Sequence, residues 1–123
     1  MDVQTGDGPK HIELPQMTLG DVSFIAAYAD LNNAPADLQA YLDTSRDGTL
    51  ASTKGKLRSQ QRLTIGGVPA RRFVYEKSNK SVVTHLTIVS GRRIYQLEAI
   101  GPADQANSAV VEHFIGSFAL VAR

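Results

Sequence analysis

Residues 56–100 read KLRSQQRLTIGGVPARRFVYEKSNKSVVTHLTIVSGRRIYQLEAI, and they predict four β-strands joined by three turns. The first strand alternates polar and apolar residues and stops at Gly66-Gly67, a two-residue hairpin signal. The next turns are expected at Ser78–Ser81 and at Ser90-Gly91, which are rich in turn-forming residues. The predicted strands form an antiparallel meander and are Lys56–Ile65, Val68–Lys77, Val82–Val89 and Arg92–Ile100.

The register of this meander follows from counting outward from its turns. The first turn places Arg71 opposite Arg62 and Tyr75 opposite Arg58. Carried through the other turns, the count assigns six residues to the core face of the sheet: Phe73, Tyr75, Leu86, Ile88, Tyr95 and Leu97. The other face is mixed, and we expect it to be half solvated or lightly covered; it carries Leu63, Val74, His85, Thr87, Ile94, Gln96 and Glu98.

Two earlier strands and two helices complete the expected fold. Residues 1–10 are polar and predict a flexible tail, so residues 11–123 form one domain. We expect strands at His11–Leu14 and Val22–Ala29, and helices at Pro35–Ala51, capped by Asn33 or Ala34, and at Pro102–Ser117. Phe118–Val121 is expected to be extended. The order ββαββββα predicts an α+β fold, an antiparallel sheet of about six strands with two helices packed on it.

The composition excludes several classes of protein. The chain has no cysteine, so it has neither a disulfide scaffold nor a thiolate metal site. Hydrophobic residues make up 42% and charged residues 20%, which is typical of an ordinary globular domain. No apolar run approaches the ~18 residues of a transmembrane helix. The N-terminus shows no apolar signal core, so we expect a cytosolic protein or one from which an export segment has been removed.

Charge is distributed unevenly along the chain. Residues 1–50 hold eight acids and two bases, whereas residues 51–93 hold ten bases and a single acid, Glu76. The two segments therefore carry −6 and +9 in a chain whose net charge is +1. Acidic and basic segments could attract one another within the domain, or the basic segment could be a docking surface for an anionic partner.

Several motifs in residues 22–121 resemble the PsbP-like fold group, which includes the photosystem II extrinsic protein PsbP, the Ran-binding Mog protein and many bacterial proteins of unknown role. The matching residues are Tyr41-Leu42-Asp43, Arg46-Asp47-Gly48, Leu63–Arg71, Arg93–Leu97 and Phe114–Phe118. Small bacterial members usually read Gly-x-Pro-Gly-Arg-Glu at the hairpin. Here Ala70 replaces the second glycine and Arg72 replaces the acid.

The resemblance implies a non-enzymatic role, because members with known roles bind partners or assist assembly. It implies no catalytic residues and no cofactor. Many bacterial relatives look exported, and relatives commonly have an extra strand before the one expected at His11. The absence of that strand would leave an exposed sheet edge, through which a homodimer could form.

The predicted register also suggests a binding site. It brings Arg62, Arg71 and Arg93 into one row with Ile88, and Arg58, toward the opposite end of the same hairpin, is a further candidate. Like charges placed opposite one another are unfavourable, so something should offset them. The row could pair with Asp43 or Asp47 of the first helix, or bind a carboxylate or phosphate group in bidentate fashion.

Other candidate sites have weaker support. Lys54, Lys56, Arg58, Lys77 and Lys80 surround Tyr75, a combination that can bind single-stranded nucleic acid, although lysines also protect hairpin edges from aggregation and Tyr75 is expected in the core. We regard nucleic acid as an unlikely partner. The histidines His11, His85 and His113 lack metal-ligand spacing and are expected to be structural or superficial.

Our leading hypothesis is a non-enzymatic binding or assembly module that uses its basic sheet end for an acidic protein partner or small anion. The alternative is a small-molecule-binding protein or enzyme with a pocket between the sheet and the first helix, lined by Tyr41, Tyr75 and Tyr95.

Overall fold

The structure, a computed structural model, describes residues 10–13, 17–19, 21–105 and 109–121. The first strands are β1 (Lys10–Glu13), β2 (Met17–Leu19) and β3 (Val22–Asp30), followed by helix α1 (Leu38–Thr53). The meander comprises β4 (Lys56–Ile65), β5 (Val68–Glu76), β6 (Val82–Ser90) and β7 (Arg93–Gly101). The short 3₁₀ helix η1 (Ala103–Gln105) and helix α2 (Ala109–Val121) follow.

The fold is α+β, with an antiparallel sheet and two helices, as the sequence predicts. Its five long strands lie in the spatial order β3-β7-β6-β5-β4, so the first long strand pairs with the last. The expected order ββαββββα with about six strands was only partly correct, because the long elements follow the order βαββββα. The short strands β1 and β2 both pair with β3 along the edge that does not face β7. The expected tail lies outside the described residues, apart from Lys10 at the start of β1.

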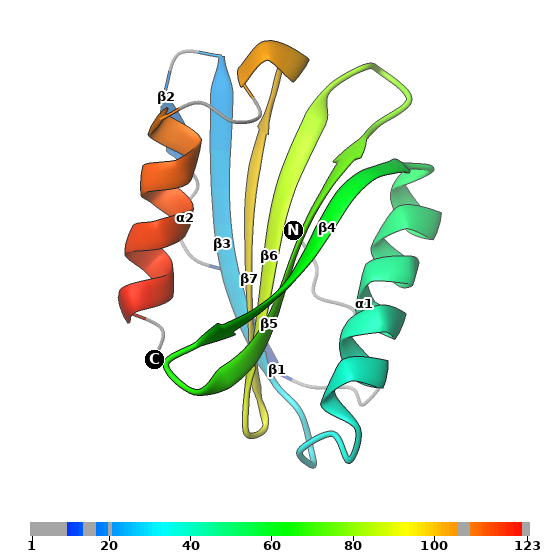
Figure 1. Ribbon diagram of the computed structural model, residues 1–123, viewed down its shortest axis with the longest axis vertical. Helices are drawn as coiled ribbons and strands as arrows, with labels where there is room; N and C mark the ends of the chain where they lie inside the picture. Colours follow the sequence, from blue (N-terminus) through cyan, green and yellow to red (C-terminus); the bar gives the residue numbers. More distant parts are fainter. Residues whose placement is uncertain (1–9, 14–16, 20, 106–108, 122–123) are drawn as a thin grey trace.

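One helix covers each face of the sheet (Figure 1). On the α2 face, Val111 and Ile115 join a buried apolar cluster that includes Phe24, Leu86 and Leu97. On the α1 face, Leu42 packs with three buried residues, Leu31, Val89 and Ile94. Of the two expectations for this face, half solvated or lightly covered, the second is therefore the one found, with α1 as the cover.

Both helix predictions need correction at their ends, since the predicted ranges were Pro35–Ala51 and Pro102–Ser117. The helix α1 begins after Asp37, whose carboxylate accepts a hydrogen bond from the backbone N–H of Ala40 at 3.0 Å. The cap is therefore Asp37 rather than Asn33 or Ala34, because a carboxylate satisfies an N–H group that Ala34 could not. The predicted second helix corresponds to the 3₁₀ helix η1 and to α2, with residues 106–108 outside the described part of the chain. Helix α2 continues to Val121, so the segment Phe118–Val121 is helical rather than extended.

The first hairpin has the register that the sequence predicts. Gly66 and Gly67 both have positive φ angles, 59° and 85°, as a two-residue turn of the primed type requires. Arg62 lies opposite Arg71. Farther from the turn, a bulge between Leu57 and Ser59 shifts the pairing, so Tyr75 lies opposite Leu57 and not opposite Arg58.

The second turn is shorter than expected, and this changes the face assignment. The backbone N–H of Lys77 donates to Ser81, and Lys80 adopts a φ of 75°. This geometry is that of a three-residue loop, where the sequence suggested four residues. Phe73 consequently lies opposite His85 instead of Leu86. Phe73 and Tyr75 therefore lie on the α1 face, whereas the other predicted core residues, Leu86, Ile88, Tyr95 and Leu97, share the α2 face.

Candidate functional site

The predicted row of arginines does not form. Arg62 and Arg71 are cross-strand partners, but Thr87 rather than Ile88 lies opposite Arg71. Arg93 begins β7 opposite Ser90, and its position in the alternation of the strand puts it on the α2 face, away from Arg71. One physical reason is the three-residue loop, which shifts β6 by one residue against β5 and thereby reverses its faces. The other is the last turn, which lies at Gly91-Arg92 and not at Ser90-Gly91, so Tyr95 rather than Arg93 lies opposite Ile88.

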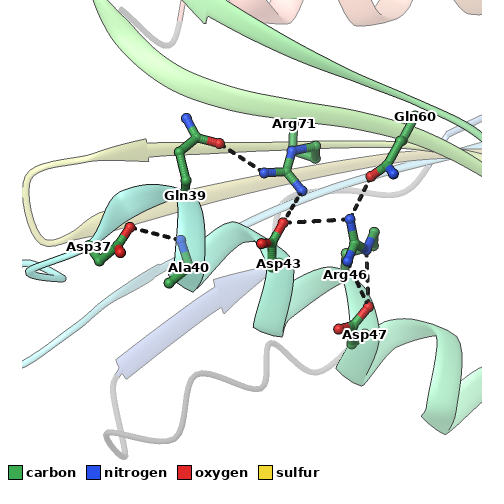
Figure 2. Close-up of polar contacts among 8 residues, drawn as sticks. All are labelled: Asp37, Gln39, Ala40, Asp43, Arg46, Asp47, Gln60 and Arg71. Carbon is green, nitrogen blue, oxygen red and sulfur yellow. Dashed lines mark hydrogen bonds and ion pairs between the residues drawn. The ribbon is translucent and has the colours of Figure 1, made fainter.

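Arg71 is buried beneath α1 and is already paired. Its side chain is 1% exposed, and its Nη1 donates to Asp43 Oδ1 at 2.6 Å (Figure 2). Its Nη2 donates to Gln39 Oε1 at 2.8 Å. The hydrogen bond from Arg71 is the main cause that lowers the pKa of the Asp43 carboxyl. Arg71 thus connects β5 to α1, and the intramolecular pairing that the sequence left open is the arrangement found.

A second arginine connects α1 to β4. Arg46 donates from Nε to Asp47 Oδ1 at 3.0 Å and from Nη1 to Gln60 Oε1 at 2.5 Å. Its Nη1 also lies 3.5 Å from Asp43 Oδ1. Figure 2 shows these residues as one connected group on the α1 side of the sheet. Both candidate acids, Asp43 and Asp47, are therefore engaged by arginines of this domain.

Arg93 is paired on the opposite face. Its Nε donates to Asp30 Oδ1 at 2.7 Å and its Nη2 to Asp30 Oδ2 at 3.1 Å, a bidentate pair. The guanidinium carbon lies 4.3 Å from the ring centroid of Tyr28. The hydrogen bond with Asp30 is the main cause that raises the pKa of Arg93. Arg93 is therefore held by an acid and an aromatic ring of the neighbouring strand β3.

Arg72 forms a contact that the sequence analysis missed. It donates from Nη1 and Nη2 to the two carboxylate oxygens of Glu112 in α2. The hydrogen bond from Arg72 lowers the pKa of the Glu112 carboxyl. Glu112 is an exposed residue of α2, and a long arginine on the sheet reaches it. The adjacent pair Arg71-Arg72 was the available signal, since neighbouring strand residues point to opposite faces.

A different set of basic residues remains exposed on β4. We call Lys56, Arg58 and Arg62 the basic edge; all three are exposed, and β4 contains no acid. Within the described residues, no ion pair to any of the three is found. Arg58 lies at the bulge of β4. Of the four arginines predicted for the site, Arg58 and Arg62 are thus on this surface, whereas Arg71 is buried and Arg93 is paired with Asp30.

The tyrosines do not assemble into the predicted sites. Tyr75 is 2% exposed and packs on Phe73, so its ring is not available to stack on a nucleic-acid base. A Cβ added to Gly55 would lie 2.6 Å from the Tyr75 ring, which shows how tightly that space is filled. Tyr41 and Tyr75 belong to the α1 side, whereas Tyr95 packs with the α2 cluster. The three tyrosines therefore do not line one pocket.

His85, Gln96 and Glu98, which the sequence places on one face of the sheet, form a polar group beneath α1. His85 is 1% exposed and stacks on Phe73. Its Nε2 lies 2.9 Å from Gln96 Oε1, and its Nδ1 lies 3.2 Å from Glu98 Oε1, at ion-pair distance but without hydrogen-bond geometry. Burial acts to raise the pKa of Glu98, but His85 and Lys77 outweigh it and the pKa is lowered. His85 and Glu98 therefore form a buried polar contact beneath α1.

The described residues contain no group of three or more potential metal-ligating His, Cys, Asp or Glu side chains. In the same part of the chain, no helix is both long and apolar enough to cross a bilayer. His113 is exposed on α2, and the side chain of His11 lies outside the description.

Comparisons with known proteins show the fold and no more. No protein-family model matches the sequence, and no curated protein matches it. Among solved structures, the chain is similar to a protein of unknown function from Pseudomonas aeruginosa, PA94, with a TM-score of 0.57 and 14% sequence identity. The match covers 98% of this chain and 83% of the other. The resemblance to the PsbP-like group therefore stays a prediction.

Proposed function

We propose that this protein is a non-enzymatic binding module that uses the basic edge, Lys56, Arg58 and Arg62, to bind an acidic protein partner. The observation that carries the proposal is the contrast between these residues and the other arginines of the sheet. Arg71, Arg72 and Arg93 each form an ion pair with an acid of this chain, whereas no described residue forms an ion pair with the basic edge. Its nearest acids act more weakly: Glu76 lies opposite Lys56, and Arg62 helps to lower the pKa of Asp43 by Coulombic attraction. Their charges also lie along one exposed strand, which suits an extended acidic surface better than a small anion.

The sequence resemblance also supports a binding role. Members of the PsbP-like group with known roles bind partners or assist assembly, which supports a binding module. The alternative, a pocket between the sheet and α1, stays a prediction that no observation on the described residues favours.

The test is the binding of immobilised poly-L-glutamate, a defined acidic polypeptide, to the full chain. We expect binding that weakens strongly between about 50 mM and about 500 mM NaCl, because exposed charges are screened. The double variant Arg58→Glu/Arg62→Glu should lose roughly ten-fold or more in affinity.

A matched control separates the basic edge from net charge. Lys54→Glu/Lys80→Glu changes the net charge equally at two other exposed residues and should retain most of the affinity. Equal losses in the two double variants would show nonspecific attraction to the basic segment, and no loss in either would show that β4 is not the contact surface.

A further inference from the structure

The strand β4 is the end of the sheet. It is the longest strand, with ten residues, and in the described part of the chain β5 is its only neighbour (Figure 1). All its residues are exposed except Leu63 and Ile65, which are half-buried. Helix α1 makes its main contacts with β5, and it contacts β4 through the hydrogen bond from Arg46 to the side chain of Gln60. An edge strand of this length presents a row of backbone groups to solvent.

The turn at Gly66-Gly67 determines which backbone N–H and C=O groups of β4 point outward, away from β5. In a two-residue hairpin the residues that flank the turn, here Ile65 and Val68, exchange backbone hydrogen bonds. The alternation of an antiparallel ladder then directs Leu63 and Gln61 toward β5 and directs Gln60, Arg62 and Thr64 outward. No backbone hydrogen bond of the described residues outside the helices and strands engages these outward groups. Three N–H and three C=O groups are therefore spaced as an added strand requires.

The charges of β4 indicate which kind of strand can pair with its outer edge. A second copy paired through this edge would place the basic edge beside another basic edge, and such like-charge contacts are unfavourable. An acidic strand would instead meet Lys56, Arg58 and Arg62 with opposite charge. We propose that β4 accepts an extended acidic segment of a partner protein as an additional strand of the sheet. This inference rests on the proposed function and names the binding mode of the same surface.

The two faces of β4 also specify a pattern for the added strand. Arg62 lies on the α1 face, whereas Leu63 and Ile65 pack with the apolar cluster of the α2 face. Side chains of an added strand alternate between the same two faces. Along Gln60–Ile65 the preferred segment therefore alternates acidic and apolar residues, with the acids on the side of Arg62. Beyond the bulge the faces reverse, and Lys56, opposite Glu76, lies on the α2 face.

The experiment uses a capped peptide of roughly eight residues with the repeat Glu-Val, long enough to cover the outward groups of β4. It is titrated into the full, isotope-labelled chain, and backbone amide hydrogen exchange is followed by NMR. We expect exchange to slow roughly ten-fold or more at Gln60, Arg62 and Thr64, and to change little at Gln61 and Leu63, which already bond to β5. A Lys-Val peptide of the same length is the charge control and should not bind.

A second pair of probes tests the backbone ladder without altering the protein. Methylation of every second backbone nitrogen of the Glu-Val peptide removes the donors from one of its edges, and the two possible sets are tested separately. One set should lose roughly ten-fold or more in affinity while the other binds like the parent peptide.

The outcomes separate the inference from the proposed function. Binding of the Glu-Val peptide that is lost in Arg58→Glu/Arg62→Glu but unchanged by both methylated sets would overturn strand addition and leave the acidic-partner proposal standing. Failure of both the Glu-Val peptide and poly-L-glutamate to bind would overturn both. Slow exchange at Gln60, Arg62 and Thr64 without peptide, at concentrations where the chain dimerises, would show that the occupant is a second copy and overturn the inference.

Discussion

The two faces of the sheet are closed by different interactions. The α2 face is mainly apolar, and the rings of Phe24 and Phe114 lie 4.6 Å apart between sheet and helix. The α1 face holds four of the five buried polar or charged side chains in the described residues: Arg71, His85, Thr87 and Gln96. Apolar packing is nondirectional and insensitive to pH, whereas buried charges require specific partners. On the α1 face, specific polar contacts therefore hold the helix. The stability of this face should depend more strongly on single residues and on pH than that of the α2 face.

The apolar side of this comparison predicts the largest effect. Leu86 is fully buried on the α2 face, so Leu86→Ala should lower the free energy of unfolding by about 3–4 kcal/mol. The loss should be the same at neutral and mildly acidic pH, because no titrating group is removed. Urea unfolding measures it, with Leu57→Ala as the control, since Leu57 is 40% exposed. A loss that changes strongly with pH would show that the α2 face is not governed by packing.

On the α1 face, Arg71 allows packing to be separated from charge. Arg71→Ala should cost about 3 kcal/mol, because it opens a cavity and removes two hydrogen bonds. Arg71→Met should cost about 1 kcal/mol, because it keeps the volume and because Asp43 and Gln39 are exposed enough to be hydrated.

The acid that pairs with Arg71 provides the decisive comparison. Asp43→Ala should destabilise the chain more than Arg71→Met does, since it leaves a buried guanidinium without its anion. Asp47→Ala, which removes an exposed acid of the same helix, is the control and should have little effect. If Arg71→Met were as damaging as Asp43→Ala, the uncompensated charge would not be the main cost.

The sequence predicted the elements of the fold better than their register. The glycine pair at Gly66-Gly67 specifies one turn type, and the first hairpin was correct near it. The segment around Lys80 contains turn formers without glycine, so nothing in it distinguished a three-residue loop from a four-residue one. That single residue moved Phe73 to the other face and separated Arg71 from the face of Arg93. The last turn was also misplaced by one residue, which moved Arg93 away from Ile88.

The candidate site was predictable in its charge but not in its pairing. Exposed Arg58 and buried Arg71 have the same side chain and lie in adjacent strands. Which of them meets an acid depends on where α1 places Asp43, and that placement is a tertiary feature. The bulge that shifts the pairing beyond Arg58 likewise has no signature in the sequence.

The buried pair of Glu98 and His85 predicts how stability changes with pH. The pKa of Glu98 is lowered below its ordinary value of 4.5 in the folded chain, so the folded state favours the carboxylate. The corresponding stability is fully present above pH 4.5 and is lost as the pH falls through the lower, folded pKa. Glu98→Gln should cost about 2 kcal/mol near neutral pH and should flatten the acid limb of the stability curve.

Urea unfolding at a series of pH values from neutral to strongly acidic measures that limb. Glu112→Gln is the control, because Glu112 also has a lowered pKa but is 47% exposed, and its contribution is screened by solvent. An acid limb that is as steep in Glu98→Gln as in the wild-type chain would assign the pH dependence to other carboxyl groups.

The smallest effect is expected for the ion pair that joins the sheet to α2. Arg72 and Glu112 have 18% and 47% exposed side chains, so solvent and salt weaken their attraction. Arg72→Met should therefore change the free energy of unfolding by less than about 1 kcal/mol, and the change should shrink further at high salt. The measurement is urea unfolding at low and high NaCl, beside Arg71→Ala on the other face. A loss above about 2 kcal/mol would mean that α2, like α1, is held by a charged contact, because exposed pairs do not reach that value. The difference between the two faces would then lie in the exposure of their arginines and not in the kind of interaction that closes them.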